Sequence, residues 1–151
     1  MRDYTKIVAW QKADDLTVAV YGATKGFPRE EVYALTSQIR RAAYSVPTNI
    51  VEGSSRESKR DYLHFLYISR GSLSETRYLI HLSQRLQYLT PENAAVLGSQ
   101  AEEVLRTLAG LISAVEREAG TISRVVAKMS SACVLTFAGL LSWVYGLKSM
   151  V

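Results

Sequence analysis

Residues 36–57 read TSQIRRAAYSVPTNIVEGSSRE, and this stretch decides the fold of the chain. From position 35 onward, apolar residues recur at steps of three and four, the spacing that places side chains along one side of an α-helix. They are Leu35, Ile39, Ala42, Ala43, Val46 and Ile50. Pro47 has no backbone N–H and clashes with the carbonyl group four residues earlier, so it predicts a kink near residues 44–46. Gly53 predicts the end of the helix, because glycine readily adopts the left-handed cap conformation.

Two neighbouring segments show the same helical periodicity. Residues 7–25 form the first, which a Gly-Phe-Pro sequence ends because the residue before proline is pushed out of helical geometry. Residues 58–89 form the second. Its start resembles a capping box, since Ser58 is followed three residues later by Asp61.

A fourth helix is predicted from Thr90, as N-cap, and Pro91, at the first helical position, to Gly120. Its apolar residues alternate steps of three and four, as in a coiled-coil seam. They are Ala94, Leu97, Ala101, Val104, Leu108, Leu111 and Val115. Four long amphipathic helices joined by short turns predict an all-α fold, an antiparallel up-down four-helix bundle over residues 1–120.

The remaining residues, 121–151, predict an additional apolar helix. Residues 129–147 contain no charged side chain and are bracketed by Lys128 and Lys148. A membrane-spanning helix needs about 20 apolar residues, so this segment reaches the threshold length, but its serines, threonine and glycines make the hydropathy borderline. Two alternatives therefore stay open: a membrane-inserted helix, or a helix that packs within an assembly.

The composition is typical of one soluble domain. The chain has 151 residues, of which 48% are hydrophobic and 21% charged. The single cysteine, Cys133, excludes an internal disulfide framework and a multi-cysteine metal site, and it fits a reducing compartment. The first residues, MRDYTKIVAWQKADD, are charged throughout and lack the apolar core of a signal peptide, so we expect a cytoplasmic protein.

Several ordered motifs resemble one known family. They are VAWQKADDLTVAVY, FPREEVYALTSQ, TSQIRRAAYSVPTNIVEG and YLHFLYISRGSLSETRYLIHL. Together they are similar to the small four-helix-bundle proteins encoded in intervening sequences of bacterial 23S rRNA. That family is itself similar to the accessory variability determinant of diversity-generating retroelements. The resemblance covers about residues 3–118. It implies a four-helix bundle, a homopentameric ring, and RNA or a nucleic-acid enzyme as partner, such as a reverse transcriptase or a ribosomal component. The family has no firmly assigned biochemical activity.

Basic residues are unevenly distributed along the chain. Residues 36–90 contain 8 Lys or Arg against 4 Asp or Glu, whereas residues 91–120 contain 2 against 5. Within 58–89, basic and polar side chains recur at steps of four and three and form one stripe, which could follow the phosphates of a nucleic acid. The candidate nucleic-acid-binding residues are Arg56, Lys59, Arg60, Arg70, Arg77, His81 and Arg85. The alternative is a solvated face, or ion pairs with the acidic residues of the fourth helix.

Catalytic and metal-binding patterns are not found in the sequence. His64 and His81 lie seventeen residues apart on one predicted helix, about 25 Å along its axis, which is too far for one metal site. No nucleophile elbow, glycine-rich phosphate loop or metal-ligand spacing occurs, so we expect no enzyme, metal or cofactor.

The remaining charged residues of the second helix predict structural ion pairs. A carboxylate near a bundle core must be neutralised or hydrogen-bonded. We therefore expect Glu52 and Glu75 to pair with Arg40 or Arg41.

Two functions remain open. The first is a non-enzymatic homo-oligomer, a pentamer on the family resemblance, that binds RNA or a nucleic-acid-processing complex through the basic face of the second and third helices. The second is a scaffold that docks a partner protein and attaches to a membrane or an assembly through its C-terminal apolar helix.

Overall fold

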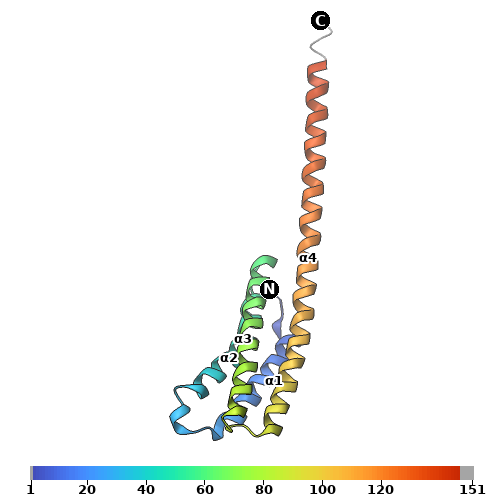
Figure 1. Cartoon of the computed structure of the whole chain (residues 1–151). Helices are drawn as coiled ribbons and strands as arrows, with labels where there is room; N and C mark the ends of the chain where they lie inside the picture. The colour runs from blue at the N-terminus through green and yellow to red at the C-terminus, as the bar shows by residue number, and fades with distance from the viewer. Residues whose placement is uncertain (1, 147–151) are drawn as a thin grey trace. The chain divides into compact units, whose positions relative to one another are not determined.

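The computed structural model describes the backbone of residues 2–146 and the side chains of residues 2–120. Its elements are short 3-10 turns and four α-helices, which Figure 1 labels. The helices are α1 (Val8–Ala23), α2 (Leu35–Ser54), α3 (Lys59–Arg85) and α4 (Pro91–Gly146). The turns are η1 (Tyr4–Lys6), η2 (Thr24–Gly26) and η3 (Arg29–Glu31). The predicted all-α bundle is confirmed.

The chain divides into two compact units. The first ends at Val115 and the second begins at Glu116. The first unit contains α1, α2, α3 and the first part of α4, and it holds the hydrophobic core. Leu16, Ile39, Leu66, Leu73 and Leu108 are among the fully buried side chains of this core.

The helix α2 contains the residues that organise this core. Its predicted apolar face is buried, including Val46 and Ile50. The helix continues through Pro47 and ends at Ser54. Because the apolar face of α2 packs against α1 and α3, the helix forms despite the proline in its interior.

The predicted left-handed cap at Gly53 is wrong. Gly53 is buried inside α2, and no glycine in the described part of the chain has a positive φ. A Cβ atom at this position would lie 2.9 Å from Cδ2 of Tyr62 and 2.9 Å from Cβ of Phe65. This glycine therefore permits the close approach of α2 to α3.

The predicted helix starts at Ser58 and Thr90 are confirmed. The hydroxyl of Ser58 accepts a hydrogen bond of 3.0 Å from the backbone N–H of Asp61. The hydroxyl of Thr90 accepts one of 3.2 Å from the backbone N–H of Asn93, and α4 begins at Pro91. Both side chains satisfy an N–H group that the first helical turn leaves without a backbone partner.

Ion pairs connect α4 to two other helices of the first unit. Lys12 of α1 lies 3.1 Å from Glu103, and Arg77 of α3 pairs with Glu102. Glu102 and Glu103 of α4 therefore face basic side chains on α3 and α1, respectively.

The predicted helix end at Gly120 is wrong, because α4 runs without interruption to Gly146. The structure thus has one long helix where the sequence predicts a fourth helix and a separate extra helix. Within the residues searched, which exclude those of uncertain placement, no helix has the length and hydropathy needed to cross a membrane. The segment 129–147, for which the sequence leaves a membrane-inserted helix and a packing helix open, lies outside the described side chains.

Candidate nucleic-acid interface

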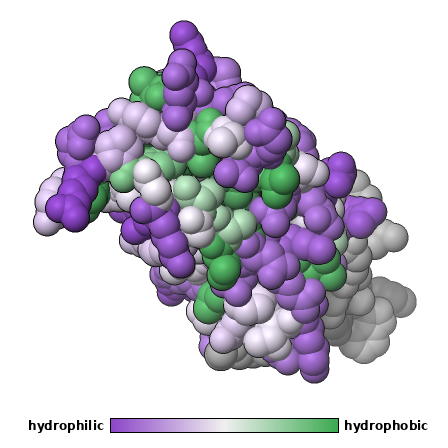
Figure 2. All heavy atoms as spheres, turned by 90° about the horizontal axis from the view of Figure 1, so that it is seen from below, coloured by the Kyte–Doolittle hydropathy of each residue, from purple (hydrophilic) through white to green (hydrophobic). Residues whose placement is uncertain are grey.

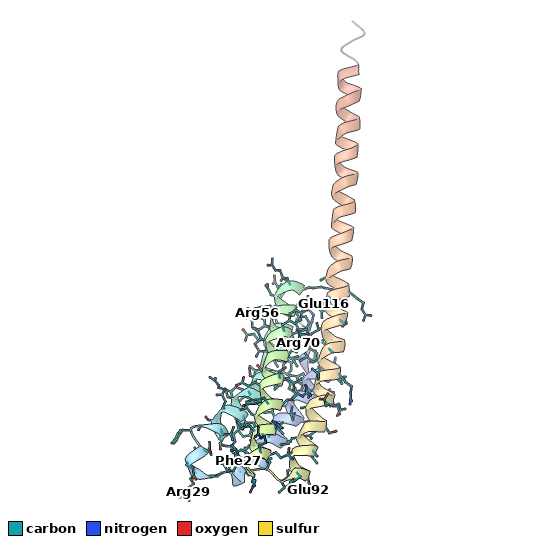
Figure 3. The ribbon with its side chains drawn as sticks, viewed as in Figure 1. Phe27, Arg29, Arg56, Arg70, Glu92 and Glu116 are labelled. Atoms are coloured by element: carbon teal, nitrogen blue, oxygen red, sulfur yellow. The ribbon has the colours of Figure 1, made fainter. Side chains whose placement is uncertain are left out.

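The predicted basic stripe lies on the exposed side of α3. Arg70, Arg77, His81 and Arg85 all have exposed side chains. They follow one another at steps of seven, four and four residues, so the helical repeat places them along one face. Figure 3 labels Arg70 on this helix.

Arg77 of the stripe forms an ion pair with Glu102 of α4. Their side chains are 43% and 46% exposed. The guanidinium donates a hydrogen bond to the carboxylate, so part of its charge is neutralised within the chain. For Arg77, the alternative of ion pairing with the fourth helix is therefore confirmed.

Arg70 keeps its charge accessible. Its guanidinium carbon lies 4.8 Å from the centre of the Tyr67 ring, a cation–π contact that does not neutralise the charge. Arg85 and Arg60 are also exposed. In the described structure these three arginines of the stripe are exposed and form no ion pair.

Two basic residues around the start of α3, Arg56 and Lys59, make contacts within the chain. Arg56, which Figure 3 labels in the loop between α2 and α3, pairs with Glu52 at 2.6 Å. Its guanidinium also lies 4.6 Å from the centre of the Phe65 ring. The Lys59 side chain is half-buried and interacts with another group of the chain. At this end of the predicted interface, Arg56 and Lys59 are therefore engaged within the chain, whereas Arg60 is exposed.

The predicted ion pairs of α2 are not those that the structure contains. Arg40 donates a hydrogen bond of 2.8 Å from Nε to the hydroxyl of Thr24, and its guanidinium lies 5.0 Å from the centre of the Tyr21 ring. Arg41 is exposed.

The two carboxylates expected as their partners have other contacts. Glu52 pairs with Arg56, one helical turn further along the chain, and Glu75 accepts a hydrogen bond from Gln38. The prediction that Glu52 or Glu75 pairs with Arg40 or Arg41 therefore does not hold in the described part of the chain.

A cavity opens between α3 and α4 in the C-terminal half of the basic stripe. Its volume is about 480 Å³. The lining residues are Arg77, Tyr78, Ile80, His81, Gln84, Ala94, Gly98 and Glu102. Sequence reasoning identified two of them, Arg77 and His81, as candidate site residues. It did not bring the lining residues together in one site, because the cavity depends on the register of α3 against α4.

A second cavity, of about 500 Å³, lies between η3, the start of α2 and the end of α3. Leu35, Leu79, Leu82 and Leu86 contribute its apolar lining. Beside them Tyr33 is 95% exposed. Figure 2 views the end of the first unit where these segments lie, and apolar side chains gather there among polar ones.

Within the residues searched, which exclude those of uncertain placement, no group of three or more His, Cys, Asp or Glu side chains could hold a metal ion.

Burial raises the pKa of the Tyr62 hydroxyl, although the nearby guanidinium of Arg2 opposes the shift. The hydroxyl of Tyr62 is buried without a hydrogen-bond partner in the described structure.

The chain was compared with known proteins. No curated protein matches it. A crystal structure of a protein of unknown function from the S23 ribosomal protein family of Bacteroides thetaiotaomicron is similar, with a TM-score of 0.65 and 25% identity. The similarity covers 70% of this chain and 98% of that chain. Residues 5–110 match the family model of the 23S rRNA-intervening sequence protein. Since this match spans more than half of the sequence, the chain belongs to the 23S rRNA-intervening sequence protein family.

Proposed function

We propose that this protein is a non-enzymatic homo-oligomer that binds RNA through the exposed basic face of α3 and the neighbouring part of α2. The observation that best supports the proposal is the accessibility of Arg70 and Arg85 on one face of α3. They are fifteen residues apart, which corresponds to about 22 Å along the helix axis. Cations at this separation can contact phosphates several nucleotides apart.

The charge distribution also favours a phosphate-binding role for α3. The acidic side chains Glu102 and Glu103 belong to α4 and face Arg77 and Lys12. Arg70, at the middle of α3, instead contacts an aromatic ring. Its positive charge is therefore available to an external anion, and neutralisation of a phosphate would release condensed counterions.

The family supports RNA as the partner, because its name refers to a sequence within 23S rRNA. The sequence resemblance described above also implies a pentamer. In a ring, several copies of a modest basic stripe would act together and would raise the local affinity for a polyanion. A reverse transcriptase or a ribosomal component could be part of the same complex.

Salt-titrated binding to a structured RNA tests the proposal. The double variant Arg70→Ala/Arg85→Ala should weaken binding and reduce the slope of log affinity against log salt concentration by about 1 for each phosphate contact that is lost. The control is Arg29→Ala/Arg106→Ala, which removes the same charge from exposed residues outside α3. If both double variants weaken binding equally, net charge explains the affinity and the assigned face is wrong.

The apolar cavity beside Tyr33 favours a second candidate function, the docking of a partner protein. An exposed tyrosine next to a leucine-lined cavity is typical of a protein-binding surface. Tyr33→Ser should then abolish binding of the partner without changing RNA affinity.

Attachment to a membrane through residues 129–147 stays a prediction from the sequence. It would leave a carbonate-resistant membrane pool that truncation after Gly120 removes.

A further inference from the structure

The cavity between α3 and α4 combines features that suit one flat, polar ring. Ile80 and Ala94 are buried and give it an apolar inner surface. Tyr78 lies at its edge with 60% of its surface exposed. His81 and Gln84 add groups that both donate and accept hydrogen bonds.

From this combination we infer that the cavity binds one unpaired nucleobase of the RNA. The inference rests on the proposed RNA-binding function and specifies which feature of the RNA the protein recognises. Proteins recognise RNA sequence mostly through unpaired bases, which stack on aromatic side chains and form hydrogen bonds along their edges. The volume of about 480 Å³ falls within the range of small-ligand pockets, about 300–1,000 Å³.

The position of the cavity favours a base over other small rings. Its lining residues on α3 lie between Arg70 and Arg85, the accessible cations of the stripe. An RNA strand that follows these cations would pass over the opening of the cavity. The base of a nucleotide between two bound phosphates could then enter it.

Arg77 is well placed to hold the phosphate of that nucleotide. Glu102 accepts a hydrogen bond from Nη2 of Arg77, so the ion pair fixes the guanidinium at the edge of the cavity. A guanidinium has five N–H donors, and one carboxylate does not use them all. Arg77 can therefore keep its contact with Glu102 while it donates to a phosphate.

Gly98 of α4 offers a way to fill the cavity without removing a charge. It lines the cavity, and a Cβ atom at this position would have no heavy atom within 4 Å. Gly98→Leu should therefore place its side chain in open space. Gly110 on the same helix is exposed and equally unobstructed, but it lies outside the cavity. Gly110→Leu is thus the matched control, with the same gain in helix propensity.

The test compares two RNA hairpins with the same stem, one fully paired and one with a single unpaired adenosine. Wild-type protein should bind the bulged hairpin about tenfold more tightly. Gly98→Leu should remove this preference while it keeps the affinity for the paired hairpin and its salt slope, and Gly110→Leu should keep the preference. With 2-aminopurine as the unpaired base, binding should quench its fluorescence, and Tyr78→Ala should reduce the quenching because the stacking surface is lost.

Each other result has a defined meaning. Equal affinity of the wild type for both hairpins overturns the nucleobase pocket but leaves the proposed RNA binding intact. If Gly98→Leu still binds the bulged hairpin more tightly than the paired one, the nucleobase pocket is also overturned. If Gly98→Leu changes only the oligomeric state in sedimentation, the cavity belongs to a contact between copies of the chain. If neither hairpin binds at low salt, the proposed function fails, and the inference fails with it.

Discussion

The hydroxyl of Thr17 in α1 lies 3.1 Å from the carbonyl oxygen of Ala43 in α2. In a regular α-helix this carbonyl would accept a hydrogen bond from the residue four positions later, which here is Pro47. Proline has no N–H, so Thr17 supplies a donor from the neighbouring helix. The hydroxyl also lies 2.8 Å from the carbonyl oxygen of Ala13, so the two acceptors share one hydrogen. The missing N–H of Pro47 is thereby offset by a hydrogen bond that links α2 to α1.

Thr17→Val should destabilise the first unit by about 1–2 kcal/mol. The change keeps the shape of the side chain but leaves the carbonyl of buried Ala43 without its donor, and an unsatisfied buried acceptor costs about 1–3 kcal/mol. Urea unfolding followed by circular dichroism measures the loss. In a Pro47→Ala background residue 47 again has a backbone N–H, so Thr17→Val should lower the free energy of unfolding by less. An equal loss of unfolding free energy in both backgrounds would contradict the role of Thr17 as a substitute donor for Pro47.

Gly53→Ala should destabilise the protein by about 1–3 kcal/mol, the usual cost of overpacking. The added Cβ atom would meet the ring of Tyr62 and the Cβ atom of Phe65 at 2.9 Å, so α2 and α3 would have to separate. Gly71→Ala in α3 is the matched control. It has no heavy atom within 4 Å of the added Cβ and should stabilise the helix by about 0.5–1 kcal/mol. Thermal unfolding of both variants should therefore show shifts of opposite sign.

These two relationships show how far the sequence could predict the fold. The spacing of residues such as Ile39 and Leu97 predicted the buried faces, and Ser58 and Thr90 predicted two helix starts, because periodicity and capping are local properties. The role of Gly53 depends on α3, and the contact of Arg40 depends on Thr24 at the end of α1. Contacts between helices require the packing register, which local patterns do not contain.

The candidate site was predictable to the same extent. The basic periodicity of α3 located Arg70 and Arg85 on one exposed face. The cavity beside them was not predictable, because it forms where Gly98 of α4 lies opposite α3. A glycine within a helical pattern gives no sign of which helix it faces.

The first turn of α4 should make a pH-dependent contribution to stability. Hydrogen bonds from its own backbone N–H and from Thr90 hold the pKa of Glu92 below its usual value of 4.5. Because the folded-state pKa is the lower one, the stabilisation is present above the unfolded-state pKa and is lost as the pH falls through the folded-state pKa. In an NMR titration, Thr90→Ala should raise the pKa of Glu92 towards 4.5. An unchanged pKa would show that the Thr90 hydroxyl has no part in the shift.

Glu102→Gln should strengthen RNA binding, because it removes the negative charge that partly neutralises Arg77 on the basic face. The affinity at low salt should rise and the salt slope should become steeper by up to about 1. The stability should fall by no more than about 1 kcal/mol, since both side chains are more than 40% exposed and such ion pairs contribute little.

The matched control is Glu103→Gln, which releases Lys12 of α1 and changes the net charge by the same amount. If the RNA contacts α3, the two variants must differ, because only Glu102 neutralises a residue of the basic stripe. Equal gains in affinity would mean that the RNA senses net charge alone. A gain confined to Glu103→Gln would place the RNA on the side of α1 and would exclude the face of α3 as the interface.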